Sequence, residues 1–255
     1  MIGVLFAGAA ALSMKAAMDV PAQVLLGLVL LGVGGLFARS RSESLSLRVT
    51  AAIPGAWLVI GSFEMSNSSW VRWFLVAAIV VGAALTARTE ELLSGATLTP
   101  LLFALTIGGV YFAVPDTEEV LVIAGAIIPL ALLGWPLGVS KIGSSGSSMA
   151  VGIMIWAAAW GGVGRPAAIL GAVSCLGMFL LVPLLPRSRG HHPALIVGLH
   201  LILVAAGSRL AGQQSNPQVA ALMAATALGG GYIVAQFAIL GHGDQEADRA
   251  LKHPR

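Results

Sequence analysis

Long apolar runs, broken at short intervals by polar or turn-forming residues, make up most of this chain. The runs are too long and too uniformly apolar for the alternating strands of an outer-membrane barrel. A helix of about 20 residues crosses the ~30 Å hydrocarbon layer of a bilayer and pairs its own backbone groups, as lipid requires. The pattern therefore predicts an all-α, polytopic membrane protein with about ten spans, over residues 2–17, 21–38, 49–65, 70–87, 98–114, 119–138, 148–163, 166–185, 193–209 and 218–240.

Turn chemistry marks the boundaries of these spans. Examples are the Asp19-Val20-Pro21 turn and the serine-rich cluster from Ser144 to Ser148, which we expect to lie outside the seventh span. The spans over 2–17 and 148–163 are the shortest, and the topology changes if either is re-entrant.

Composition agrees with this interpretation, because 57% of the 255 residues are hydrophobic and only 10% are charged. Ten spans leave no room for a globular domain, so we expect one transmembrane domain over 1–240 and a short, solvated cytoplasmic tail over 241–255. The first apolar run has no positive residues before it, which favours a retained span over a cleaved signal peptide. The single cysteine, Cys175, has no partner for an internal disulfide and is read as a small buried hydrophobe.

The basic residues indicate the orientation. With the N-terminus inside, ten Lys and Arg fall on the cytoplasmic side and four on the outer side, so the sequence predicts a bacterial cytoplasmic membrane protein with both ends cytoplasmic. The inner set is Arg39, Arg41, Arg48, Arg88, Lys141, Arg187, Arg189, Arg249, Lys252 and Arg255, and the outer set is Lys15, Arg72, Arg165 and Arg209.

Five spans precede Pro115 and five follow it, which divides the membrane domain into halves 1–115 and 116–240. An odd number of spans per half would invert one half relative to the other, as in many secondary transporters. In span count alone, this 5+5 layout resembles the drug/metabolite transporter group, an analogy at the level of fold.

The function that fits this layout is a permease or exporter of a small solute that works by alternating access. The alternative is a non-catalytic membrane subunit of a transport, secretion, envelope or respiratory complex. The chain has no HExxH, GxSxG, Walker or aspartate-rich motif, so we do not expect an enzyme. An intramembrane transferase acting on a lipid-linked substrate would require the predicted outer-face acids to converge, namely Glu64, Asp116, Glu118 and Glu119.

The candidate substrate-binding residues are polar, aromatic or helix-breaking groups within spans. Backbone freed at the Gly229-Gly230-Gly231 segment would line a cavity, with Gln236, His200 and Trp156 beside it. The simpler alternative is packing, because glycines allow helices to approach closely and a neutral histidine bridges helices by hydrogen bonds.

Glu64 is the candidate for coupling to a proton or cation, since an ionisable group in a span is energetically expensive. Its alternative role is an interfacial carboxylate that pairs with Arg72. We expect no metal site, because His191, His192 and His242 lack Asp, Glu or Cys at ligand spacing. Composition indicates no cofactor and no nucleic acid, and leaves membrane lipids, a small solute, partner subunits or a homo-oligomer as partners.

Overall fold

The computed structural model describes residues 2–36, 44–61, 63, 69–92, 99–113, 118–134, 142–162, 165–174, 202, 206–207 and 209–252. They form helices with short turns and contain no strand, which confirms the all-α prediction. The helices are α1 (Ile2–Met18), α2 (Ala22–Leu36), α3 (Ser44–Gly61), α4 (Ser69–Leu92), α5 (Thr99–Ala113), α6 (Glu118–Gly134), α7 (Gly143–Gly161), α8 (Pro166–Ser174) and α11 (Pro217–Lys252).

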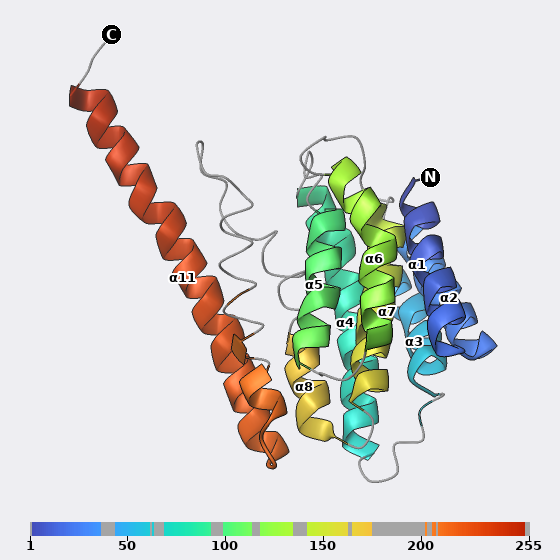
Figure 1. The fold of residues 1–255 in the computed structure, drawn as a ribbon. Helices are drawn as coiled ribbons and strands as arrows, with labels where there is room; N and C mark the ends of the chain where they lie inside the picture. Colours follow the sequence, from blue (N-terminus) through green and yellow to red (C-terminus); the bar gives the residue numbers. More distant parts are fainter. Residues whose placement is uncertain are drawn as a thin grey trace.

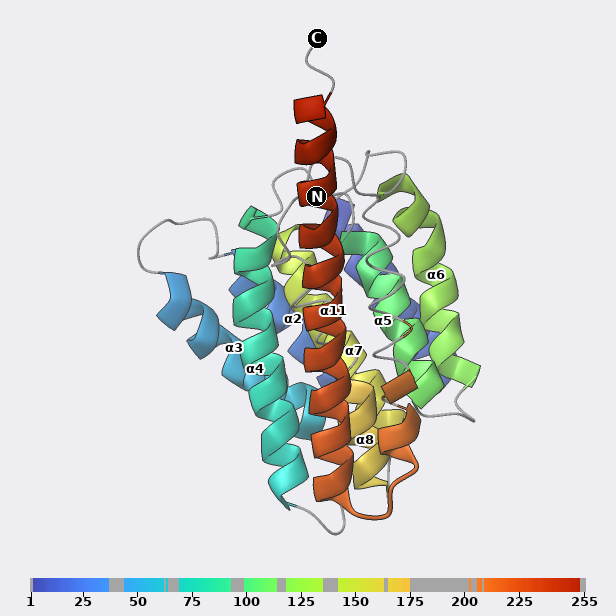
Figure 2. The same ribbon diagram turned by 90° about the vertical axis from the view of Figure 1, so that its left-hand side faces the viewer.

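The helices form a bundle in which, from α1 to α8, each helix runs in the opposite direction to the one before it (Figure 1). The start of α1 and the C-terminal end of α11 lie at the same end of the molecule, which we call the upper end (Figure 1). The starts of α4 and α11 lie at the opposite, lower end (Figure 2). The N-terminal end of the bundle and the end of the last helix are therefore on one side.

Local chemistry explains where several helices begin and end. α1 ends at the lower end, where the Lys15 ammonium donates to Asp19 Oδ1 at 3.0 Å and to the Val20 carbonyl at 2.9 Å. Asp19 has a left-handed φ of 47°, a conformation that reverses the chain after a helix. α8 and α11 both start with a proline. Proline lacks a backbone N–H, and this loss costs nothing at the first position of a helix, where an N–H has no acceptor within the helix. Asn216 caps α11 by accepting a hydrogen bond from the Gln218 backbone N–H at 2.9 Å.

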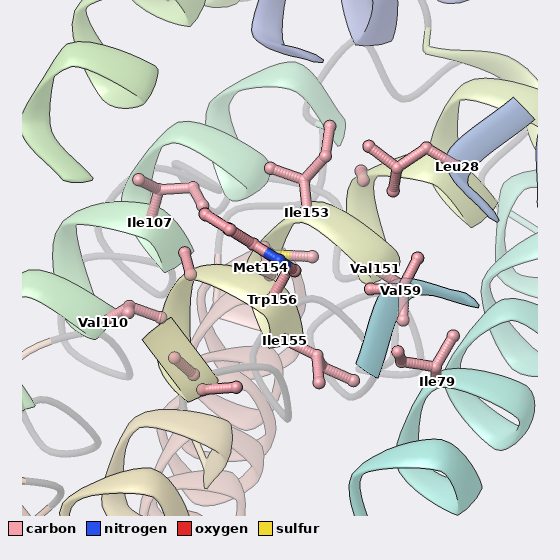
Figure 3. Close-up of a cluster of buried hydrophobic side chains, with 14 of the residues drawn as sticks. Leu28, Val59, Ile79, Ile107, Val110, Val151, Ile153, Met154, Ile155 and Trp156 are labelled. Carbon is pink, nitrogen blue, oxygen red and sulfur yellow. The ribbon is translucent and has the colours of Figure 1, made fainter. Parts of the chain in front are cut away.

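α7 is the centre of the bundle, and its residues from Ser145 to Ala159 are all buried. It packs against α1, α2, α4, α5 and α8. Its many glycines and alanines let these neighbours come close, and larger side chains from several helices fill the remaining space around it (Figure 3). They include Leu28 from α2, Val59 from α3, Ile79 from α4 and Ile107 from α5.

The outward faces of the bundle are also apolar. Large hydrophobic side chains are exposed on most of the peripheral helices, including Leu12 on α1, Leu26 and Val29 on α2, Trp73 on α4, Leu121 and Leu132 on α6, and Leu222 and Ile233 on α11. Among the described helices, one segment, Pro217–Val234 of α11, is long and apolar enough on its own to cross a membrane. Four apolar helical segments are shorter: Ala22–Leu36, Arg48–Gly61, Trp70–Leu85 and Glu119–Leu133.

Four described helices extend beyond the sequence prediction. α3 begins at Ser44 instead of residue 49, and α4 runs to Leu92 instead of residue 87. α7 begins at Gly143 instead of residue 148, so the serine cluster expected to be a loop is its first turns. There Ser148 Oγ donates to the Ser144 carbonyl at 3.0 Å, and such bonds within the helix satisfy a buried hydroxyl. α11 continues to Lys252, past the expected end at residue 240, so much of the predicted tail is helical.

Candidate functional site

The structure locates only some of the candidate residues. His200 and Glu64 lie outside the described residues, and the backbone of Gln236 belongs to α11 while its side chain lies outside the described part. The roles predicted for these three residues therefore stay predictions.

The Gly229-Gly230-Gly231 segment is not a break in a helix. α11 runs through it without interruption, contrary to the sequence expectation. Three consecutive glycines weaken a helix but do not prevent it when the flanking residues form good turns. Gly229 and Gly230 face open space, whereas Gly231 is buried and Leu228 packs against the main core. This part of α11 therefore touches the bundle on one side only.

Trp156, on α7, lies in the hydrophobic core of the bundle, with only 2% of its surface exposed. The Phe63 ring lies 5.7 Å from it, and the Trp160 ring is stacked at 6.3 Å. Its indole Nε1–H has no hydrogen-bond partner in the structure as described. An unpaired buried donor costs about 1–3 kcal/mol, so its presence in a native core requires an explanation.

Arg72 contacts the residue that precedes the predicted coupling residue, Glu64, in the chain. Its guanidinium donates to the Phe63 carbonyl at 2.7 Å, and Phe63 immediately precedes Glu64 in the chain. The same residue, Phe63, packs its ring on Trp156. The predicted coupling position is therefore adjacent in sequence to a residue that contacts both a cation and the Trp156 ring.

Helix α2 covers one face of α7 at very short distances. A Cβ at Gly35 would lie 2.6 Å from the Ser144 carbonyl oxygen and from Ser145 Cα, and one at Gly32 would lie 2.9 Å from Met149 Sδ. Further along α7, a Cβ at Gly152 would lie 2.7 Å from Leu28 and Leu31. Glycine at these positions permits the close approach of the two helices.

Ser145, Gly152 and Trp156 lie on this same face of α7. Gly152 follows Ser145 by seven residues, about two helical turns, and Trp156 follows Gly152 by four residues, about one turn. Ser145 is 7% exposed and its hydroxyl, like the Trp156 indole, has no hydrogen-bond partner in the described structure. At a rise of 1.5 Å per residue, the two positions are about 16 Å apart along the helix. Between them lie Leu28, Leu31 and Met149.

The candidate site is therefore the α2–α7 interface, a closely packed apolar contact with one unpaired polar group toward each end. Trp156 was already a candidate substrate-binding residue from the sequence, and that role stays a prediction. Ser145 was missed because a run of serines and glycines is typical of a turn, and only burial in the bundle distinguishes it from one. Neither Gly229 to Gly231 nor α11 packs extensively on this interface, since α11 contacts mainly α8.

No metal ion site forms in the described part of the chain, where no three His, Cys, Asp or Glu side chains come together. Of the acids that an intramembrane transferase would use, Glu64 and Asp116 lie outside the described residues. Glu119 lies at the start of α6 and is half-buried.

Comparison with models of protein families, with curated proteins and with solved structures gave no match.

Proposed function

We propose that the protein is a multi-spanning permease or exporter of a small solute in a bacterial cytoplasmic membrane. In this proposal ten helices cross the bilayer as two inverted halves, and the solute passes along the α2–α7 interface by alternating access.

The apolar outer surface supports placement in a bilayer. Soluble monomers rarely expose contiguous apolar patches of more than a few hundred Å². Here the large exposed side chains lie on helices around the bundle, while glycine, alanine and serine make up much of the central helix α7. That distribution fits a protein whose solvent is lipid and whose helices associate through small residues.

The contacts between helices support inverted halves. If α6 begins the second half, α1 corresponds to α6 and α2 to α7, and both of these pairs are in contact. The members of each pair run in opposite directions (Figure 1). The α2–α3 contact also has its counterpart in α7–α8. Corresponding helices that touch in antiparallel orientation are what a two-fold axis in the membrane plane produces.

The observation that carries the proposal is the pair of unpartnered polar groups on the α2-facing side of α7, Ser145 Oγ and Trp156 Nε1. A static core keeps few such groups, whereas a path that opens would use them in turn as hydrogen-bond donors to a passing solute. The solute would then carry hydrogen-bond acceptors. In the closed interface, Leu28, Leu31 and Met149 separate the two groups.

Cysteine labelling tests this proposal without knowledge of the solute, because Cys175 is the one native cysteine and Cys175→Ser gives a clean background. In that background, we expect Ser145→Cys to react with a membrane-impermeant maleimide from one side of the membrane, and Trp160→Cys from the other. Ala158→Cys is the matched control, because Ala158 is fully buried on the opposite face of α7. If all three variants stay unlabelled in both right-side-out and inverted vesicles, the interface is a static core and the permease proposal is wrong.

Topology gives a second expected result. The start of α1 and the end of α11 share one side of the bundle (Figure 1), and the distribution of basic residues in the sequence supports a cytoplasmic location for that side. A reporter fused after Arg255 should therefore be active only if it functions in the cytoplasm, and an N-terminal reporter should behave in the same way. An alkaline phosphatase fusion after Arg255 that is active outside would reverse the orientation.

The alternative function, a non-catalytic subunit of a membrane complex, is favoured by one observation. α11 has 36 residues, about 54 Å of helix, and it carries exposed apolar side chains at Leu222, Ile233 and Val234. A stoichiometric partner that co-purifies in mild detergent, together with a static α2–α7 interface, would favour this alternative.

A further inference from the structure

A cleft lies at the lower end of the molecule, between the start of α4 and the start of α11. Figure 2 shows both helix starts at this end. The cleft has a volume of about 750 Å³ and is lined by Trp70, Ser215, Asn216, Pro217 and Gln218. Its size is within the range of 300–1,000 Å³ that is usual for small-molecule sites. It is separate from the α2–α7 interface, with which it shares no lining residue.

The lining combines an aromatic ring with uncharged hydrogen-bonding groups. Trp70 is 49% exposed, so part of its ring is open to a ligand. The side chains of Ser215, Asn216 and Gln218 supply a hydroxyl and two amides, which both donate and accept hydrogen bonds. Arg72, two residues after Trp70, does not line the cleft and donates instead to the Phe63 carbonyl.

Asn216 has a fixed conformation because it caps α11. Its Oδ1 accepts from the Gln218 N–H at 2.9 Å, and its carbonyl accepts from the Ala220 N–H at 3.0 Å. The cap uses the side-chain oxygen and leaves the Nδ2 protons as donors. A helix start that also lines a cleft is thus pre-organised, which reduces the entropy lost when a ligand binds.

From this lining we infer that the cleft binds a neutral, hydroxyl-rich ring, the chemistry of a sugar unit. The ring stacks on Trp70, and its hydroxyls exchange hydrogen bonds with Asn216, Gln218 and Ser215. A charged group would enter a cleft whose described lining offers no opposite charge, so its desolvation would be uncompensated. The sugar comes either from a glycolipid headgroup in the adjacent leaflet or from a free saccharide. This site does not depend on the permease proposal.

The test uses the full-length protein in a polyoxyethylene detergent, since maltoside or glucoside detergents would occupy the site. Intrinsic tryptophan fluorescence is followed during titration with sucrose, and in a second arm with lipid nanodiscs that contain glucosyl diacylglycerol. We expect a saturable change in at least one arm and its loss in Trp70→Phe. A response to sucrose supports a free saccharide, and a response to the glycolipid alone supports a headgroup.

Two variants separate binding from folding. Asn216→Ser keeps a good helix cap but removes the amide, so it should melt like the wild type and bind about fivefold more weakly, the loss of about one hydrogen bond. Trp73→Phe is the matched aromatic control, because Trp73 lies on the same helix, packs its ring 5.4 Å from Trp57 and does not line the cleft. Its titration should match that of the wild type.

Three results would overturn the inference. They are the absence of a saturable response in both arms, an unchanged response in Trp70→Phe, and an equal response to nanodiscs that contain only phosphatidylglycerol. The last result would indicate general lipid contact instead of sugar recognition.

Discussion

Alanine at Gly55 is expected to destabilise the protein by about 2 kcal/mol, although alanine is the better helix former. A Cβ at Gly55 would lie 2.9 Å from the Gly27 carbonyl oxygen, and one at Gly27 would lie 2.7 Å from the Gly55 carbonyl oxygen. The obstructing atoms are backbone, so α2 and α3 must separate as whole helices. Overpacking of this kind costs about 1–3 kcal/mol, more than the gain in helix propensity of up to about 1 kcal/mol. Unfolding by sodium dodecyl sulfate in mixed micelles measures the change.

Gly125→Ala is the matched control for this prediction. Gly125 lies within α6, and nothing lies within 4 Å of where its Cβ would be, so alanine there should leave stability unchanged or raise it slightly. The double variant Gly27→Ala/Gly55→Ala should lose less than the sum of the single variants, because one separation of the helices accommodates both methyl groups. Equal stability of Gly55→Ala and Gly125→Ala would show that α2 and α3 do not cross at these glycines.

Phenylalanine at Trp156 is expected to reduce solute flux at least tenfold while the protein remains folded. The substitution removes the indole N–H, which has no partner in the described structure, and keeps an aromatic ring against Phe63 and Trp160. The smaller ring leaves a cavity, but the loss of an unpaired buried donor offsets it, so stability should stay within about 1.5 kcal/mol of the wild type. Trp156→Ala, by contrast, should lose about 3–5 kcal/mol.

Two measurements distinguish a functional from a structural Trp156. Solute flux is assayed in proteoliposomes with a panel of small solutes that carry hydrogen-bond acceptors, and stability is measured by the same micelle unfolding. Ser145→Ala, which removes the second unpartnered group, should also lower flux without loss of stability. Full flux in both Trp156→Phe and Ser145→Ala would leave these residues as packing groups and favour the subunit alternative.

Most of the described helices could be predicted from the sequence. Each apolar run must pair its backbone N–H and C=O groups within itself, whatever its neighbours are, and a helix does this. The starts of α1, α2, α4, α5, α6, α8 and α11 lie within one residue of the predicted ones. Turn residues such as Asp19, Pro166 and Pro217 act on the backbone next to them, so the helix boundaries that they set can be predicted from the sequence.

Features that depend on a segment's surroundings could not be predicted from the sequence. The serines before Met149 have the composition of a loop, yet contacts with α2 and bonds within α7 make them the start of the central helix. Gly229 to Gly231 have the composition of a helix break, yet α11 continues through them. Helix propensity is a weak term of about 1 kcal/mol per residue. Packing outweighs it at the start of α7, and the helix-forming residues on either side outweigh it at the glycines of α11.

The sequence by itself determined that the chain is helical, where most of its helices lie and that it is predominantly apolar, because these properties follow from local backbone pairing and from composition. Only the tertiary structure decided which of the 32 glycines are contact points, which polar groups are left unpaired and which residues line a cleft. Those properties arise from groups far apart in sequence, such as Gly27 with Gly55, Gly35 with Ser145, and Trp70 with Asn216. An apolar helix has the same pattern on every face, so its sequence does not specify which face meets which neighbour.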